Sequence, residues 1–151
     1  MLVLDQITKL IISKFMLLGE AHPVITNFFS LVHWGNTGAA WSLFSGKNLL
    51  LGCIGIVALF LLYYFRRQLE FQCVGGQIAM GMIMGGILGN ALDRFFRGHV
   101  VDFLYFYVVA GSGREIGYPA FNVADISITS GVCFLFLLSI FHWKRDETQS
   151  V

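Results

Sequence analysis

Two aspartates are the residues of this sequence best suited to chemistry. Asp102 and Asp125 lie in the stretches GHVVDF (98–103) and FNVADISI (121–128), at the edges of the most apolar tracts. A carboxylate at a membrane boundary is costly, so its presence there favours a functional role. Two close carboxylates cannot both ionise cheaply. One keeps a proton while the other activates a water, which is the chemistry of aspartic proteases.

Asp125 also has a simpler interpretation. Asp125 opens an apolar stretch, with Asn122 three residues before it, and so fits an ordinary helix start that caps free amides. Asp102 stands between Val101 and Phe103, an apolar setting that disfavours ionisation. The sequence by itself leaves the helix cap open.

Four polar residues gather at the end of the third apolar stretch. On a helix, Asn90 would face Asp93 and Arg94, and Asp93 would face Arg97. The group can satisfy its own charges, so an anchor at a helix end is the simpler interpretation. Asp93 then has a cation beside it, which the two aspartates above lack.

Other reactive sets are weaker. Ser13 precedes Lys14 inside an apolar stretch, and Ser42 shares a segment with Lys47 but has no orienting partner for a serine–lysine protease. His33 and His99 of the polar segments lack a third metal ligand. The three cysteines are dispersed, so neither a zinc site nor a disulfide framework is indicated.

The composition is that of a small integral membrane protein. Of 151 residues, 56% are hydrophobic and 13% are charged, with a mean hydropathy of +0.72. An ordinary soluble domain has roughly 25% charged residues. The net charge of +1 and the lack of a basic run argue against nucleic-acid binding. The expected partners are membrane lipid and a molecule embedded in it.

Four stretches approach the roughly 20 apolar residues of a transmembrane helix. They are about 1–18, 48–65, 71–92 and 126–143. The first carries charges, but Asp5 and Lys9 are four apart and can pair on a helix. It lacks the clean apolar core of a cleavable signal peptide, so we expect it in the mature protein. In the third, Gly81, Gly85 and Gly89 form a small-residue stripe for close helix packing.

Basic residues set the expected orientation. Pairs of them follow the second and fourth spans, namely Arg66 with Arg67 and Lys144 with Arg145. Because such flanks stay in the cytoplasm, both termini are expected inside. The segments 19–47 and 93–125 then share the outer face, which brings Asp102 and Asp125 to a similar depth.

Two outer runs have strand-like composition. Residues 24–34 and 99–109 are rich in β-branched and aromatic side chains, and 111–115 (GSGRE) is typical of a loop. The expected fold class is an all-α membrane protein with four transmembrane helices and a small extracytoplasmic β element. It forms a single polytopic domain over residues 1–151.

Five motifs in this order resemble those of lipoprotein signal peptidase, also called signal peptidase II, an aspartyl peptidase family. They are DQITK (5–9), NTGAAWS (36–42), GNALDR (89–94), GHVVDF (98–103) and FNVAD (121–125). Together they extend over the first 125 residues. One such motif is a weak signal, whereas five in order are specific.

The resemblance implies an endopeptidase of the bacterial inner (plasma) membrane. It would remove signal peptides from prolipoproteins, cutting before a cysteine that carries diacylglycerol, with Asp102 and Asp125 as the catalytic dyad. The other matched residues would order the site (Asn90, Asp93, Arg94, Asn122), contact substrate (Asn36, the loop around Gly38) or support the structure (Asp5, Lys9). The implied partners are the lipidated prolipoprotein and membrane lipid, with no nucleic acid, no metal and no other cofactor. We expect a monomer.

The chain departs from the family pattern in three places. Only four residues precede Asp5, where the family has a longer apolar lead, so we expect a short first span or a start downstream of the natural one. Trp41 stands where the family more often has Phe, and it keeps an aromatic side chain at the interface. The loop 107–118 is long for the family, and we expect it to affect access to the cleft and substrate preference.

Two further classes fit less well. A proton-coupled transporter subunit would use Asp93, Asp102 and Asp125 as a relay, and an intramembrane protease would hold its aspartates deep within two spans. Here the second and third spans are free of charge and the aspartates gather at one face. Both observations favour the peptidase.

Overall fold

The computed structural model describes residues 1–38, 44, 46–67, 73–111 and 113–149, with the backbone alone for 141–149. Its elements are α1 (Leu2–Phe15), β1 (Ala21–Ile25), β2 (Phe29–Asn36), α2 (Asn48–Tyr64), η2 (Phe65–Arg67), α3 (Val74–Phe96), β3 (Val100–Val109), β4 (Glu115–Gly117) and α4 (Val123–Gln149). Trp41 and Ser42 of the second motif lie outside the described residues, as does Ser112 of the loop 107–118.

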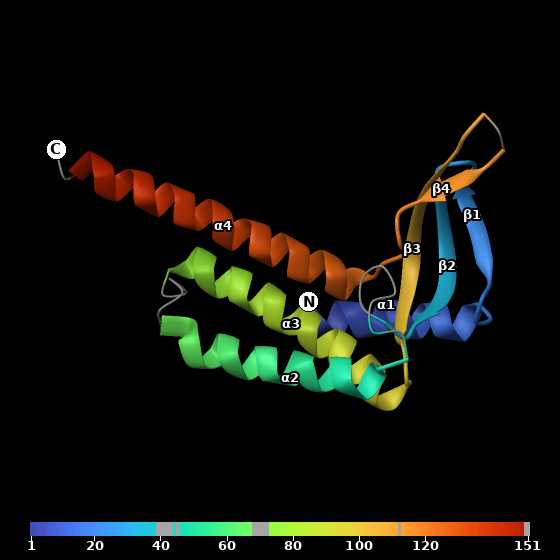
Figure 1. Cartoon of the computed structure of the whole chain (residues 1–151), viewed down its shortest axis with the longest axis horizontal. Coiled ribbons are helices and arrows are strands. Elements are labelled where there is room, and N and C mark those ends of the chain that lie inside the picture. The colour runs from blue at the N-terminus through green and yellow to red at the C-terminus, as the bar shows by residue number, and fades with distance from the viewer. Residues whose placement is uncertain (39–43, 45, 68–72, 112, 150–151) are drawn as a thin grey trace.

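Three helices extend from one side of a small sheet, with α3 in contact with both α2 and α4 (Figure 1). The α3–α4 contact depends on glycine. A Cβ on Gly86 would lie 2.5 Å from the backbone oxygen of Ala124, and one on Gly131 would lie 2.9 Å from that of Ala79. Any side chain at either glycine would push the two helix backbones apart.

The predicted glycine stripe is only partly a packing surface. Gly85 and Gly89 face α1, where a Cβ would meet Leu2 and Asp5 respectively, but Gly81 has nothing within 4 Å. Gly86, which the four-residue spacing did not select, makes the close contact with α4 instead. A spacing of four drifts around a helix of 3.6 residues per turn, so the outer members of such a stripe face different neighbours.

Within the part of the chain that the structure describes, two helices are long and apolar enough to cross a membrane, Asn48–Arg67 and Val123–Ile140, with mean hydropathies of 2.2 and 2.0. Only 6% and 17% of these two windows are buried, so they expose their apolar side chains rather than forming the core of the molecule. The predicted span 1–18 forms the shorter α1. The third helix continues past the predicted span 71–92 to Phe96, and the side of the membrane on which residues 93–125 lie stays a prediction.

The predicted β element is confirmed as a four-stranded antiparallel sheet in the order β1-β2-β3-β4. The first half of β3 pairs with β2, and its far end pairs with β4. Glu115, which we expected in a loop, opens β4 because its backbone pairs with Val109. At the other end, Gly98 has a φ of +74° and turns the chain from α3 into β3.

The first helix joins the sheet to the other helices. It contacts α3, α4 and β3, and Ile12 packs with Val101 and Phe103 in a small apolar core under the sheet. Asp5 and Lys9 lie on the same side of α1 as Ile12, and all three are buried. This side of α1 therefore brings two charged groups against the ends of α3 and α4.

Candidate active site

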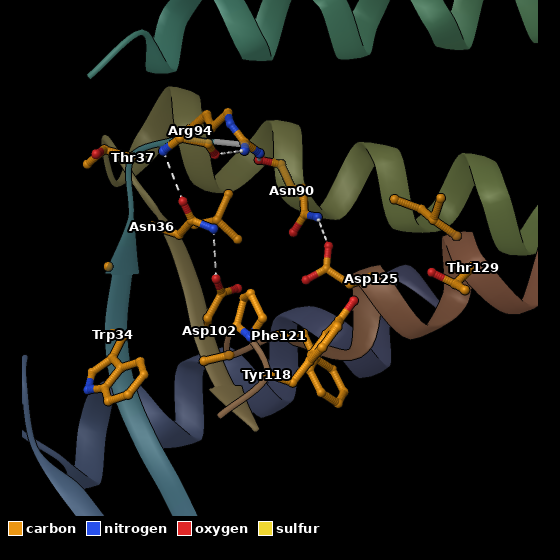
Figure 2. A pocket seen from close by; sticks show the side chains of 16 residues that line it. Trp34, Asn36, Thr37, Asn90, Arg94, Asp102, Tyr118, Phe121, Asp125 and Thr129 are labelled. Atoms are coloured by element: carbon orange, nitrogen blue, oxygen red, sulfur yellow. Dashed lines mark hydrogen bonds between the residues drawn. The ribbon is translucent and has the colours of Figure 1, made fainter. Parts of the chain in front are cut away.

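Asp102 and Asp125 line one cavity of about 700 Å³ at the junction of sheet and helices (Figure 2). Asp102 is the third residue of β3, and Asp125 lies in the first turn of α4. Predicted site residues from two other segments share the lining, namely Asn36 with Gly38 and Asn90 with Arg94. The structure thus brings together four separate segments of the sequence.

Asp102 is held by two side-chain amides. Nδ2 of Asn36, at the end of β2, donates to Oδ2 of Asp102 at 2.9 Å. Nδ2 of Asn122, just before α4, donates to Oδ1 at 2.7 Å. The residue is only 3% exposed. Each carboxyl oxygen therefore has a fixed direction while part of the group still faces the cavity.

Asp125 is both a helix cap and part of the cavity wall. Oδ1 of Asn122 accepts from the backbone amide of Asp125 at 3.0 Å, and Oδ2 of Asp125 accepts from the backbone amide of Asn122 at 3.2 Å. This reciprocal pair is a capping box, as the simpler interpretation expected. The remaining oxygen, Oδ1, accepts from Nδ2 of Asn90 at 2.8 Å.

The electrostatics keep Asp102 near the point of titration. Burial, followed by the charge of Asp125, raises the pKa of Asp102 from 3.8 to about 7, against the opposing effect of its amide donors and of Lys9. Within the described residues, neither aspartate forms an ion pair. Near neutral pH the cavity can therefore hold one protonated and one ionised carboxyl group, as acid–base catalysis requires.

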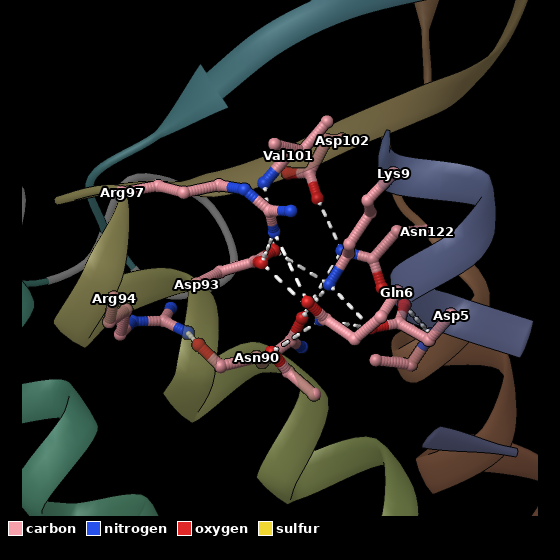
Figure 3. A network of polar contacts seen from close by, with 12 residues as sticks. Asp5, Gln6, Lys9, Asn90, Asp93, Arg94, Arg97, Val101, Asp102 and Asn122 are labelled. Carbon is pink, nitrogen blue, oxygen red and sulfur yellow. Dashed lines mark hydrogen bonds and ion pairs between the residues drawn. The ribbon is translucent and has the colours of Figure 1, made fainter. Parts of the chain in front are cut away.

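A buried ion network lies behind the cavity (Figure 3). The predicted pair of Asp5 and Lys9 is confirmed at 3.0 Å, and Lys9 also contacts Asp93 at 2.8 Å. Asp93 pairs with Arg97, as its spacing predicted. Nζ of Lys9 donates to Oδ1 of Asn90 at 2.9 Å. Asn90 therefore turns its amide toward Lys9 and α4, not toward Asp93 as expected from its own helix.

Arg94 holds the backbone at Gly38, two residues after the end of β2. Its guanidinium donates to the backbone oxygen of Gly38 at 2.8 Å and to that of Asn90 at 3.4 Å. The backbone amide of Gly38 in turn donates to Oδ1 of Asn36 at 2.9 Å. The bond from Gly38 orients the Asn36 amide so that its Nδ2 points at Asp102.

The described members of the weaker sets of the sequence do not line the cavity, and Ser42 lies outside the described residues. His33 contacts the Met16 carbonyl oxygen at 2.9 Å and Ser13 at 3.5 Å, and Lys14 lies over the ring of Phe15. Among the described residues, no three His, Cys, Asp or Glu side chains are placed to hold a metal ion.

Comparison with known proteins decides the family. The model of the family described as signal peptidase (SPase) II matches residues 1–141. The chain belongs to the signal peptidase II family. Members of this family are aspartic peptidases.

Curated relatives of the chain support the same family assignment. A "lipoprotein signal peptidase" of Bacillus pumilus is 38% identical, over 97% of this chain and 92% of the relative. One of Symbiobacterium thermophilum is 39% identical, over 89% of this chain and 86% of the relative. A solved structure described as a bacterial membrane enzyme has a TM-score of 0.78 at 34% identity, covering 92% of this chain and 82% of that one.

Sequence reasoning missed several residues of the signal peptidase II cavity. Trp34, Tyr118, Phe121 and Thr129 line it (Figure 2). Thr129 follows Asp125 by four residues and could have been found from helix periodicity. Trp34 and Tyr118 gave no local signal, because the sheet brings them to the cavity by pairing strands that are distant in sequence.

Proposed function

We propose that this chain is an aspartyl endopeptidase that removes signal peptides from diacylglyceryl-modified prolipoproteins, cutting before the lipidated cysteine. One observation carries the proposal: Asp102 and Asp125 line the same cavity, each held by amide donors, and neither forms an ion pair with any residue that the structure describes. Membership of the signal peptidase II family supports the same substrate class.

In the proposed mechanism a water lies between the two carboxyl groups. The ionised carboxylate takes a proton from this water as its oxygen attacks the scissile carbonyl carbon, and the protonated carboxyl donates to the carbonyl oxygen. The tetrahedral intermediate then collapses and the C–N bond breaks. The amine leaves with the proton of the carboxyl that acted as base, and a hydroxyl of the intermediate returns its proton to the other carboxylate as the carbonyl re-forms. The raised pKa of Asp102 supports this sharing of one proton at neutral pH.

We further propose four transmembrane spans with both termini in the cytoplasm and the cavity at the outer face. The two apolar helices and the basic residues after α2 support this topology. Substrate lipid chains would stay in the bilayer beside the spans, so lipid burial would supply binding energy. A reporter active only outside the cytoplasm, fused after residue 149, should give no signal, whereas one inserted at Gly113 should be active.

The decisive assay follows cleavage of a lipidated prolipoprotein on a gel. Asp102→Asn and Asp125→Asn, made separately, should each abolish product formation, because each removes one half of the acid–base pair. Glu20→Gln is the matched control, since it neutralises an acidic residue beside β1 that lies outside the cavity lining. It should cleave like the wild type.

Two outcomes would overturn the assignment. Wild-type turnover by either aspartate variant would exclude the dyad. Equal cleavage of the same precursor with and without its diacylglycerol group would exclude the proposed substrate class while leaving a peptidase in place.

A further inference from the structure

Lys9 is a fully buried cation that does not touch the cavity. Its ammonium group, 0% exposed, lies 3.0 Å from Asp5, 2.8 Å from Asp93 and 2.9 Å from Oδ1 of Asn90 (Figure 3). An ammonium has three N–H donors, so the three contacts use all of them. Two of these acceptors carry charge and hold the lysine in place, while the third is a neutral amide of the site.

The contact with Asn90 decides which way that amide points. Oδ1 of Asn90 accepts from Lys9 and, at 3.3 Å, from Nδ2 of Asn122. With its oxygen held between two donors, Asn90 must present Nδ2 to the other side, where it donates to Oδ1 of Asp125 at 2.8 Å. A flipped amide would set its oxygen against the Asp125 carboxyl group and lose all three of these hydrogen bonds.

The charges of the buried network balance. Asp5 and Asp93 carry two negative charges, and Lys9 and Arg97 carry two positive ones. Among the described residues, Lys9 is the member of this set that also contacts Asn90, which donates a hydrogen bond to Asp125. Without it, two buried acids would face one arginine, and the oxygen of Asn90 would lose its shorter hydrogen bond and keep only the 3.3 Å bond from Asn122.

We infer that Lys9 is a positioning residue of the peptidase, which acts through Asn90 by fixing the amide orientation that aims Nδ2 at Asp125. The inference rests on the proposed function, since it concerns the same site. A lysine that only ties α1 to α3 would also be buried and paired. The two roles differ in whether the effect of Lys9 on catalysis requires Asn90.

A double-mutant cycle separates these roles in the full-length protein. Lys9→Met, Asn90→Ala and the double variant are assayed for kcat and KM on a lipidated prolipoprotein. We expect each single change to lower kcat by about 10-fold or more with little change in KM, and the double variant to be no slower than the slower single variant within about 2-fold. Independent effects that multiply would overturn the inference.

The pH profile gives a second readout that simple packing would not move. The charge of Asp125 helps to raise the pKa of Asp102, so Asp102 is the member of the dyad that keeps its proton to higher pH, and the charge of Lys9 lowers this pKa. Lys9→Met should therefore shift the alkaline limb of the activity profile, where Asp102 loses its proton, to higher pH. Among the described residues, the other ionisable groups of the cavity and of the network behind it are Asp5, Asp93, Arg94, Arg97 and Tyr118, and His99 lies against Gly35 of the cavity wall. An unshifted profile would contradict a role for Lys9 at the dyad.

Folding controls keep the result interpretable. Ser127→Ala removes a buried hydrogen bond between α4 and α3 that does not involve the dyad, so it should lower stability without moving the pH profile. Lys9→Gln keeps N–H donors without the charge and should retain more activity than Lys9→Met. If neither Lys9 variant folds, the residue is structural and the inference fails. Inactive wild-type protein would instead refute the proposed function.

Discussion

The backbone amide of Ala124 donates a 2.9 Å hydrogen bond to the carboxylate of Asp5, across 119 positions of sequence. This bond ties the start of the last helix to the first helix. Gly89 of α3 lies against both residues, since a Cβ there would be 2.5 Å from Oδ2 of Asp5 and 3.5 Å from Cβ of Ala124. Three helices meet at a point where only a glycine fits without displacement.

Gly89→Ala should therefore destabilise the protein and slow cleavage. Overpacking of this kind costs about 1–3 kcal/mol of unfolding free energy, and it would move Asp5 away from α4. Gly81→Ala, in the same helix but with nothing within 4 Å, is the control and should be neutral or slightly stabilising. Thermal unfolding in detergent and the cleavage assay would measure both, and equal behaviour of the two variants would contradict the packing argument.

The two asparagines that donate hydrogen bonds to Asp102 should differ in their effect on kcat. Asn36 bonds one carboxyl group, whereas Asn122 bonds Asp102 and also caps Asp125. Losing one preorganised donor typically costs about 10²–10³ in kcat, so Asn36→Ala should fall in this range and Asn122→Ala should be slower. Comparison of kcat for the two purified variants tests the ranking, which a slower Asn36→Ala would reverse.

Protein stability should depend on the ionisation of Asp102. Its pKa is about 7 in the folded protein against an ordinary 3.8, so the folded state binds more protons between these values. Stability is then lost as pH rises through this window. Asp102→Asn removes the titrating group and should unfold at a higher temperature than the wild type at about pH 8, with the difference disappearing near about pH 4.

Unfolding curves at the two pH values provide the measurement, with Ser127→Ala as the control. That variant should be offset from the wild type by the same amount at both pH values, because its hydroxyl does not titrate. A stability gain of Asp102→Asn that is identical at both would show that the carboxyl group does not titrate in this window.

A metal chelator should leave cleavage unchanged. The proposed reaction uses two carboxyl groups and a water, with no Lewis acid. The measurement is the rate of prolipoprotein cleavage before and after exhaustive treatment with a chelator. A loss of activity that zinc restores would favour a metallopeptidase and refute this expectation.

Local patterns in the sequence were sufficient to predict much of this site. The pairs Asp5–Lys9 and Asp93–Arg97 follow from a separation of four residues on one helix, and both form. The cap at Asp125 follows from the asparagine three residues earlier. Strands rich in β-branched and aromatic residues were also recognisable, because their composition differs from that of the apolar helices.

Contacts between distant segments could not be predicted in the same way. Nothing in the spacing indicates that Lys9 reaches Asp93 and Asn90, or that Asn90 turns toward Asp125. Hydropathy ends the third apolar span at residue 92 because it counts the charge of Asp93 as a cost, whereas α3 continues to Phe96. Two ion pairs offset this cost. The pair with Arg97 follows from the spacing, but the pair with Lys9 of α1 is visible only in three dimensions.

The bond between Ala124 and Asp5 also has a consequence for biosynthesis. Chains fold from the N-terminus as they leave the ribosome, so α1 must wait for almost the whole chain before its carboxylate finds its partner in α4. Asp125 arrives with the same last helix. If Asp125 belongs to the catalytic dyad as proposed, a nascent copy would be unable to hydrolyse a peptide until α4 has been synthesised.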